Sequence, residues 1–398
     1  MTAVSQKQSI RDLSDAALIG KRVIVRVDFN VPIKDGAVTD DTRIRLSLPT
    51  IQYLIDRQAK VIIVTHFGRP KGQVIDTLKL GPVHRHLETV LGQSVVYADA
   101  CVGPSVVSAI DGLQNGGVVL LENVRFHSGE EQNDWSFSEK LAQLGDIFVL
   151  DAFGAAHRAH ASTVGIGQFL PAVAGLLMEK ELQVLGQMLS QPKSPFVGII
   201  GGSKVSTKLA VLRQLLSKVD TLIIGGGMVY TFLKVQGHSV GNSLVEDSQL
   251  DEAQQFLIDA EKSSTNVVFP IDHVVVKTVD DEAPTQVVTD IVDQQIAVDV
   301  GPQTLQLIAS SLDAAQTILW NGPLGIFEIP SFANGTFSVA KMLANSSATT
   351  VVGGGDSVAA IQATGLSDQI SHISTGGGAT LAFLEGQALP GETVLMTK

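Results

Sequence analysis

Short apolar runs rich in valine and isoleucine recur along the chain, and longer stretches with helical spacing separate them. In the first half the runs fall at Val23–Val27, Val61–Thr65, Val95–Tyr97, Val118–Leu121 and Ile147–Leu150. The helical stretches between them include Ile44–Arg57, Leu80–Leu91 and Phe137–Leu144. Because parallel strands need a long crossover, usually a helix, this alternation predicts a parallel β-sheet covered by helices.

The second half repeats the pattern. Its apolar runs are Phe196–Ile200, Thr221–Ile224, Val267–Phe269, Thr317–Trp320, Thr350–Val352 and His372–Ser374. These runs are apolar nearly throughout rather than at alternate positions, which is typical of sheets covered on both faces. Since 398 residues exceed what one hydrophobic core usually serves, we expect an α/β protein with two doubly wound domains.

The segment from Ala172 to Leu189 carries apolar residues at helical spacing, and prolines in Gln191–Pro195 end it. We therefore predict an N-terminal domain at 1–171, a joining helix at 172–190 and a C-terminal domain at 191–388. A helix in this position is either a hinge or an ordinary packing helix, and the pattern leaves both open.

The composition is that of a globular protein, with 44% hydrophobic and 17% charged residues. No uncharged apolar run reaches the roughly 20 residues that a membrane span needs, and the N-terminal sequence lacks an apolar signal-peptide region. Cys101 is the only cysteine, so no internal disulfide can form. We expect a cytoplasmic location. The net charge of -12 disfavours a nucleic-acid partner.

Arginine is concentrated in the first half. Ten of the eleven arginines precede residue 171, and only Arg213 follows. The planar guanidinium group binds carboxylates and phosphates through two parallel hydrogen bonds. The first half is therefore the one that we expect to face a small polyanion.

Polar loops follow four strands of the first half, where ligands bind in open parallel sheets. The loops are Asp28–Pro32, Thr65–Pro70, Glu122–His127 and Asp151–His160. Three of them carry an arginine, and a fourth arginine begins the first crossover helix; the four are Arg43, Arg69, Arg125 and Arg158. Their expected convergence on one sheet edge predicts an anion site.

Glycine-rich loops end four strands of the second half, at Gly201–Lys208, Gly225–Gly227, Gly353–Ser357 and Ser374–Gly378. Backbone N–H groups in such a loop before a helix favour phosphate groups. Neither G-x-x-x-x-G-K-[ST] nor G-x-G-x-x-G occurs, so a P-loop enzyme and a standard dinucleotide-binding domain are not supported.

The phosphate groups that such glycine loops favour suggest a nucleotide as the ligand of the second half, and side chains beside the loops support this hypothesis. Lys204 and Lys208 are four residues apart, so in one helix both ammonium groups lie on the same face. Asp356 offers a hard oxygen to Mg²⁺ or caps its own helix, and both readings stay open. Glu328, in the loop after Thr317–Trp320, could accept hydrogen bonds from ribose hydroxyls.

Taken together, these loops resemble those of phosphoglycerate kinases. The matching motifs run in order along almost the whole chain: VDFNVP, TDDTRI, THFGRP, ENVRFH, DAFGAAHRAHAS, GGSKVSTK, WNGPLGIFE, GGGDS and STGGGA. The resemblance implies two Rossmann-like domains separated by a cleft, with hinge closure between them. It implies transfer of the acyl phosphate of 1,3-bisphosphoglycerate to ADP, giving 3-phosphoglycerate and ATP, by a monomer whose tail, 389–398, packs on the first domain.

The resemblance also assigns residues to each ligand. Those expected to bind the triose phosphate are Asp28, Asn30, Arg43, His66, Arg69, Arg125 and Arg158. Those expected to bind the nucleotide are Gly202, Lys204, Lys208, Gly226, Asn321, Gly325, Glu328, Gly353, Gly354, Gly355, Asp356 and Ser357. Asp356 is also the expected Mg²⁺ ligand. The expected catalytic residues are Arg43, Lys204, Gly354 and Gly377, with Arg43 and Lys204 at the transferring phosphoryl group.

Three positions depart from the family pattern: Ser128, where proline is common, Val229, where alanine is common, and Gln303, where lysine is common. None of them is an expected site residue. Two other functions fit the sequence less well. A nucleotide-linked dehydrogenase needs the missing dinucleotide fingerprint, and a non-catalytic two-domain binding protein leaves Lys204, Lys208 and Asp356 unexplained.

Overall fold

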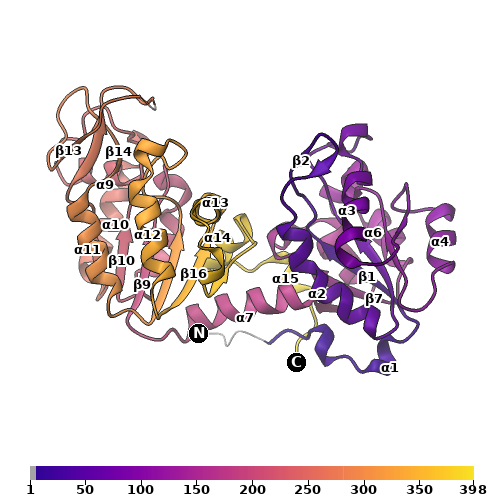
Figure 1. Ribbon diagram of the computed structural model, residues 1–398. Helices are drawn as coiled ribbons and strands as arrows, with labels where there is room; N and C mark the ends of the chain where they lie inside the picture. Colours follow the sequence, from indigo (N-terminus) through magenta and orange to yellow (C-terminus); the bar gives the residue numbers. More distant parts are fainter. Residues whose placement is uncertain (1–5, 281) are drawn as a thin grey trace. The chain divides into compact units, whose positions relative to one another are not determined.

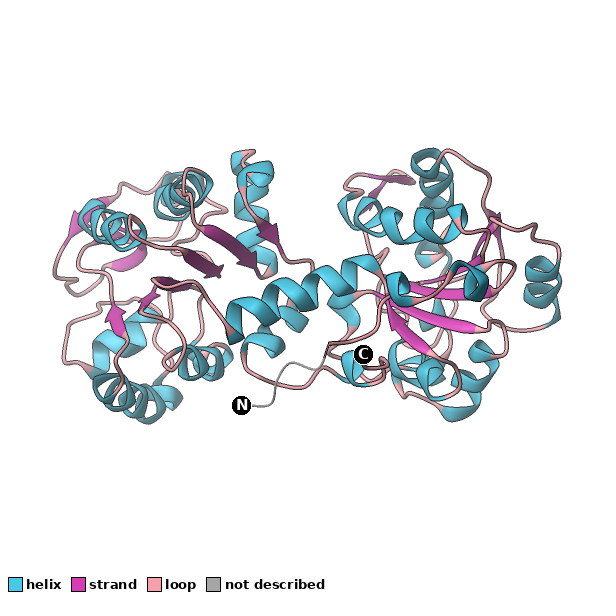
Figure 2. Ribbon diagram, turned by 90° about the horizontal axis from the view of Figure 1, so that it is seen from below, coloured by secondary structure: helices cyan, strands magenta, loops and turns pink. Residues whose placement is uncertain are grey.

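The apolar runs form two six-stranded parallel sheets (Figure 1), each flanked by helices (Figure 2). The computed structural model describes residues 6–280 and 282–398, so the first five residues of the expected N-terminal domain lie outside the described residues. Two compact units result: one runs up to Gly186 and includes Ala388–Lys398, and the other is Gln187–Gln387. The prediction of two doubly wound α/β domains is confirmed.

The sheet of the first unit has the strand order β5-β6-β4-β1-β7-β8. Its strands are Val96–Tyr97 (β5), Val118–Leu120 (β6), Lys60–Val64 (β4), Arg22–Val27 (β1), Ile147–Asp151 (β7) and Ala172–Ala174 (β8). The longer helices of this unit are Thr42–Asp56 (α2), Gly81–Leu91 (α3), Pro104–Asp111 (α4) and Trp135–Ala142 (α6). Val25 in β1 lies opposite Ile63 in β4 and Val149 in β7, and all three are buried in one core. The carboxyl ends of these three strands therefore lie side by side.

The prediction of one helix from Ala172 to Leu189 is wrong at its start. Ala172–Ala174 forms the edge strand β8, with Ala172 opposite Phe148 of β7. These small and β-branched residues are buried and their backbone completes the sheet, so tertiary pairing overrides the helical spacing. The helix itself, Leu176–Ser190 (α7), ends before the prolines as predicted, and the division between the units falls within it.

The sheet of the second unit has the order β11-β10-β9-β15-β16-β17. Its strands are Asn266–Val268 (β11), Thr221–Ile224 (β10), Phe196–Ile200 (β9), Thr317–Asn321 (β15), Thr349–Gly353 (β16) and His372–Ile373 (β17). The helices of this unit include Leu209–Leu215 (α8), Val229–Val235 (α9), Leu250–Lys262 (α10), Pro302–Leu312 (α11), Asn334–Ala344 (α12), Gly355–Thr364 (α13) and Gly378–Leu384 (α14). Trp320 in β15 is fully buried in its core.

Two smaller sheets were not predicted from the sequence. His273–Val276 (β12), Gln286–Val288 (β13) and Ile296–Val300 (β14) form an antiparallel sheet in the order β13-β12-β14. Ile33–Lys34 (β2) and Ala37–Val38 (β3) form a hairpin in the first unit. Short strands of this kind depend on their pairing partners more than on local periodicity.

The C-terminal residues pack on the first unit. The N–H of Gly391, in the short helix Pro390–Thr393 (α15), donates to the carbonyl of Ala156 at 2.8 Å. The N–H of Met396 donates to the carbonyl of Ala172 at 2.9 Å, and the N–H of Gln8 donates to the carbonyl of Met396 at 2.8 Å. Among the described residues, the search for a helix both apolar and long enough to cross a bilayer found none.

We predict that Val173→Ala destabilises the first unit by about 2 kcal/mol, because Val173 in β8 is fully buried in its core. Urea unfolding is followed by tryptophan fluorescence in a Trp320→Phe background. In this background Trp135 is the remaining tryptophan, so the signal reports on the first unit. Val107→Ala in α4 is the control, since Val107 is 45% exposed. Equal effects of the two substitutions would contradict the buried edge strand.

Candidate active site

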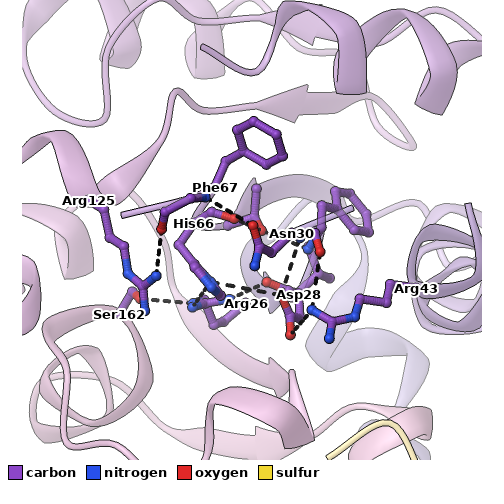
Figure 3. A network of polar contacts seen from close by, with 12 residues as sticks. Arg26, Asp28, Asn30, Arg43, His66, Phe67, Arg125 and Ser162 are labelled. Atoms are coloured by element: carbon purple, nitrogen blue, oxygen red, sulfur yellow. Dashed lines mark hydrogen bonds and ion pairs between the residues drawn. The ribbon is translucent and has the colours of Figure 1, made fainter. Parts of the chain in front are cut away.

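The loops after β1, β4 and β7 bring most of the expected anion-binding residues of the first unit to one edge of its sheet. Figure 3 shows Asp28, Asn30, Arg43, His66 and Arg125 in one network of polar contacts. Arg69 and Arg158 are exposed on the loops that follow β4 and β7. Positive charge from Arg158 also acts on His66, together with that of Arg43 and Arg125. The predicted convergence of arginines on this edge therefore holds for Arg43, Arg125 and Arg158.

Arg43 is anchored by the loop after β1. Its Nη1 donates to Oδ2 of Asp28 at 3.0 Å and to the carbonyl of Asn30 at 3.2 Å. The side chain of Arg43 remains 42% exposed, so the guanidinium is held in place and still open to solvent. Asn30 ties this loop to the next one, because its Oδ1 accepts from the N–H of Gly68 at 2.9 Å.

His66 is buried and electrically neutral in this environment. Burial lowers the pKa of its imidazole well below the ordinary value, and the positive charges of the surrounding arginines lower it further. Nη2 of Arg26 lies 3.0 Å from Nδ1 of His66. A guanidinium only donates, so Nδ1 accepts and Nε2 carries the ring proton.

Arg125 is almost fully buried, and burial lowers the pKa of its guanidinium. Its Nη1 donates to the carbonyl of Gly68 at 2.7 Å, and its Nε lies 3.4 Å from Oε1 of Glu131. Arg158 is exposed, and its Nε donates to Nε2 of His157 at 3.1 Å. The edge thus offers one buried and several accessible guanidinium groups to an anion.

Two residues that organise this edge, Arg26 and Asn123, are not among those expected from the sequence. Arg26 is fully buried in β1, within a run that was interpreted only as an apolar strand; a charged residue inside such a run is the signal that could have revealed it. Asn123 is also fully buried. Its Oδ1 accepts from the N–H of Phe67 at 3.0 Å and its Nδ2 donates to the carbonyl of Phe67 at 2.7 Å, which fixes the loop that carries His66.

The second unit has a pocket of about 180 Å³ at the carboxyl ends of β15 and β16. Seven expected residues line it: Lys208, Asn321, Gly354, Gly355, Asp356, Ser357 and Gly377. Nζ of Lys208 donates to Oδ1 of Asn321. Nδ2 of the buried Asn321 has no hydrogen-bond partner, so the pocket holds a donor that a ligand can satisfy.

Charge and glycine backbone complete the pocket wall. Burial lowers the pKa of the Lys208 ammonium, while the nearby carboxylates of Asp356 and Glu385 oppose the shift. Gly354 precedes α13 with φ of 91°, a conformation that glycine adopts readily, and the free N–H groups at the start of α13 follow it. Ser357 is buried, and its Oγ accepts from the N–H of Gly322 at 2.5 Å. This hydrogen bond links two segments that line the pocket.

The expectation that Lys204 and Lys208 share one helical face is wrong. A 3₁₀ turn, Val205–Thr207, separates them, and Lys208 is the residue that precedes α8. Lys204 is exposed and does not line the pocket, whereas Lys208 does. The spacing fails because the chain tightens before the α-helix begins, so the two positions do not share one α-helical rotation.

Gly202 and Gly226 serve loop packing. A Cβ on Gly226 would lie 2.5 Å from the carbonyl oxygen of Gly202, and φ of Gly226 is 73°. The N–H of Gly202 donates to the carbonyl of Pro323 at 3.0 Å, so this N–H already has a partner. Three further expected residues do not line the pocket: Gly325, Glu328 and Gly353. Glu328 is exposed.

The residues present suit Mg²⁺ held largely by a ligand's phosphates. Asp356 supplies one exposed carboxylate on the pocket wall. Within the described part of the chain, no group of three or more His, Cys, Asp and Glu side chains could hold a metal by itself. Mg²⁺ characteristically keeps waters and binds one or two carboxylates plus phosphate oxygens, which fits a single aspartate here.

Asp299 in β14 lies buried behind the loop that contains Gly325. Its Oδ2 accepts from the N–H of Gly335, at the start of α12, at 2.6 Å, and its Oδ1 has no hydrogen-bond partner. A Cβ on Gly325 would lie 2.3 Å from Oδ1 of Asp299, so the loop passes directly over this carboxyl group. Burial raises the pKa of Asp299 to about 7.

Comparison with known proteins extends the likeness over nearly the whole chain. A family model described as "Phosphoglycerate kinase" matches residues 13–387. The chain is 51% identical over 395 residues to a phosphoglycerate kinase from Dictyoglomus turgidum, covering 98% of this chain and 100% of that protein. It is 53% identical to one from Moorella thermoacetica, with 97% and 99% covered. The solved structure of the Coxiella burnetii phosphoglycerate kinase superposes with a TM-score of 0.89 at 42% identity, with 98% of each chain covered.

We predict that Asp299→Asn gains stability relative to the parent as the pH rises. A carboxyl group whose pKa is raised on folding stabilises the folded state at low pH, and this contribution is lost as the pH rises through about 7. Between pH 5 and pH 8 the difference in free energy of unfolding should move by about 2–3 kcal/mol in favour of the asparagine variant. Urea unfolding reported by Trp320, in a Trp135→Phe background, measures it.

The exposed Asp293→Asn is the matched control for this pH series. A difference between Asp299→Asn and the parent that stays constant from pH 5 to pH 8 would contradict the buried, proton-binding carboxyl group.

Proposed function

This chain belongs to the phosphoglycerate kinase family, and we propose that each of its two units binds one substrate of the reaction. That reaction is the reversible transfer of the acyl phosphate of 1,3-bisphosphoglycerate to ADP, which yields 3-phosphoglycerate and ATP. The first unit, which runs up to Gly186 and includes Ala388–Lys398, binds the triose phosphate. The second unit, Gln187–Gln387, binds the nucleotide.

The observation that carries this proposal is the different chemistry of the two strand-end surfaces. The surface of the first unit gathers guanidinium groups around His66, whose pKa burial lowers and the positive charges of the arginines lower further. The pocket of the second unit combines the Lys208 ammonium, the unpartnered Nδ2 of Asn321 and the start of α13. The first suits a small molecule with a carboxylate and a phosphate, and the second suits a diphosphate or triphosphate chain.

In the first unit, Arg43, Arg69, Arg125 and Arg158 bind the anionic groups of the triose phosphate. Asp28 and Asn30 orient Arg43 and accept from the single hydroxyl of the substrate, and neutral His66 donates from Nε2. In the direction that consumes ATP, the nucleophile is an ionised carboxylate, so no catalytic base is required. Positioning and charge neutralisation then supply the catalysis.

In the second unit, Lys208, Asn321 and the N–H groups at Gly354 and Gly355 bind the nucleotide phosphates, and Glu328 accepts from the ribose. Gly202, Gly226, Gly325, Gly353 and Ser357 support the loops that shape this site. Asp356 holds Mg²⁺, which when bound neutralises phosphate charge. Arg43 and Lys204 neutralise the transferring phosphoryl group, and the glycine loops at Gly354 and Gly377 give it backbone donors.

We also propose that the enzyme acts as a cytoplasmic monomer. The single cysteine, Cys101, is buried, and burial raises the pKa of its thiol, so it does not offer a reactive thiolate for pairing between chains. Size-exclusion chromatography with light scattering tests the oligomeric state, and a dimer at micromolar concentration would contradict the proposal.

We predict that Arg43→Ala lowers kcat by about 100-fold, because one donor to developing charge is lost from the site, while the Kd for ADP changes less than about twofold. A coupled ATP-forming assay and calorimetry give the two numbers. Arg45→Ala is the control on the same helix, since Arg45 is exposed and pairs with Asp41. A loss of ADP affinity in Arg43→Ala as large as the loss in kcat would contradict the assignment of Arg43 to the triose-phosphate site.

We predict that Lys208→Met raises the KM for ATP about tenfold, because the loss of one charge-assisted contact costs about 1.4 kcal/mol. The Kd for 3-phosphoglycerate should stay unchanged. Lys234→Met is the control, since Lys234 is an exposed lysine of the same unit that pairs with Asp247. If the KM for ATP does not change in Lys208→Met, this pocket is not part of the nucleotide site.

A further inference from the structure

We infer that Glu130, Ser162 and Arg26 form a buried relay that fixes the tautomer of His66 and thereby positions its Nε2 proton for the triose phosphate. The inference rests on the proposed role of His66 in binding that substrate. Arg26, His66 and Ser162 are drawn together in Figure 3. None of the three relay residues was an expected site residue.

Arg26 is the centre of the relay. It is fully buried in β1, and three of its nitrogens have partners. Nε donates to Oγ of Ser162 at 2.8 Å, Nη1 donates to the carbonyl of Val27, and Nη2 donates to Nδ1 of His66, which lies 3.0 Å away. These contacts on three sides hold the guanidinium in one orientation, so one N–H is directed at the imidazole.

Ser162 sets the direction of the hydrogen bonds. A hydroxyl has one proton, and since Oγ accepts from Arg26, that proton goes to Oε1 of Glu130 at 2.6 Å. The N–H of Ser162 donates to Oε2 of the same carboxylate at 2.9 Å. Both carboxylate oxygens of the fully buried Glu130 therefore accept hydrogen bonds from Ser162.

The carboxylate of Asp28 competes for Nδ1 of His66, so the tautomer of His66 depends on this relay. Oδ1 of Asp28 lies 3.9 Å from Nδ1 of His66, and a carboxylate at Nδ1 favours the tautomer with the proton on that nitrogen. Arg26 is closer, at 3.0 Å, and requires Nδ1 to accept. If Arg26 is released from Ser162, Asp28 can draw the ring proton to Nδ1 and deprive Nε2 of it.

The energetic cost of the relay also argues for a role in orientation. Glu130 and Arg26 are both fully buried, and removing such charges from water carries a penalty that their attraction does not reliably recover. The serine between them keeps the charges from forming a direct ion pair. A buried arrangement of this kind gives directional hydrogen bonds to the histidine that apolar side chains cannot supply.

The test is nitrogen NMR of ¹⁵N-histidine-labelled protein, with the His66 signals assigned by their loss in His66→Phe. In the parent we expect an unprotonated Nδ1 and a protonated Nε2. In Ser162→Ala and in the nearly isosteric Glu130→Gln, we expect Nδ1 to gain the proton in a substantial fraction of molecules. Ser138→Ala is the control, because this equally buried serine donates only to the carbonyl of Asp134 and does not touch the relay.

Kinetics supply the second readout. The two relay variants should raise the KM for 3-phosphoglycerate about tenfold, the effect of one lost hydrogen bond to an anion, and leave the KM for ATP within twofold. A proton on Nδ1 in the parent overturns the relay without any variant. An unchanged tautomer in both relay variants overturns it as well. Failure of the proposed substrate site is seen separately, as an unchanged KM for 3-phosphoglycerate in His66→Phe.

Discussion

Parallel pairing of the central strands is the constraint on which both ligand surfaces depend. In the first unit β1 lies between β4 and β7, with Val27 opposite Asp151, so the loops carrying Asp28, His66 and Arg158 start at one edge. In the second, Asn321 at the end of β15 lies opposite Ile200 and Gly353. Uniform strand direction thus places groups that are distant in the sequence beside one another.

The two surfaces use this placement in different ways. The first is built from charged side chains that hold one another: Asp28 anchors Arg43, and burial together with the arginines lowers the pKa of His66. The second depends on close backbone packing, in which Gly226 fits against the backbone of Gly202 only because Gly226 has no side chain. Several of its glycines therefore shape the pocket, while Lys208 and Asn321 provide its polar contacts.

Most strands of the two six-stranded sheets, the unit count and the loops of both surfaces could be predicted from the sequence, because each depends on local patterns and on the direction of parallel strands. The pairing of side chains could not. Arg26 was hidden within an apolar run, and its partners Ser162 and His66 are brought to it only by folding. The separation of Lys204 from Lys208 by a 3₁₀ turn, and β8 at the start of the expected helix, depend on tertiary contacts that periodicity does not encode.

The central claim, that each unit binds one substrate, is tested most directly by hydrogen–deuterium exchange with each ligand alone. With 3-phosphoglycerate, amides in the loops at 28–32, 65–70, 122–127 and 151–160 should be protected, and those of the second unit should not. With Mg²⁺ and ADP, protection should appear at 201–208, 321–328, 353–357 and 374–378. Protection of the second unit's loops by 3-phosphoglycerate alone, with the first unit unchanged, would contradict the account.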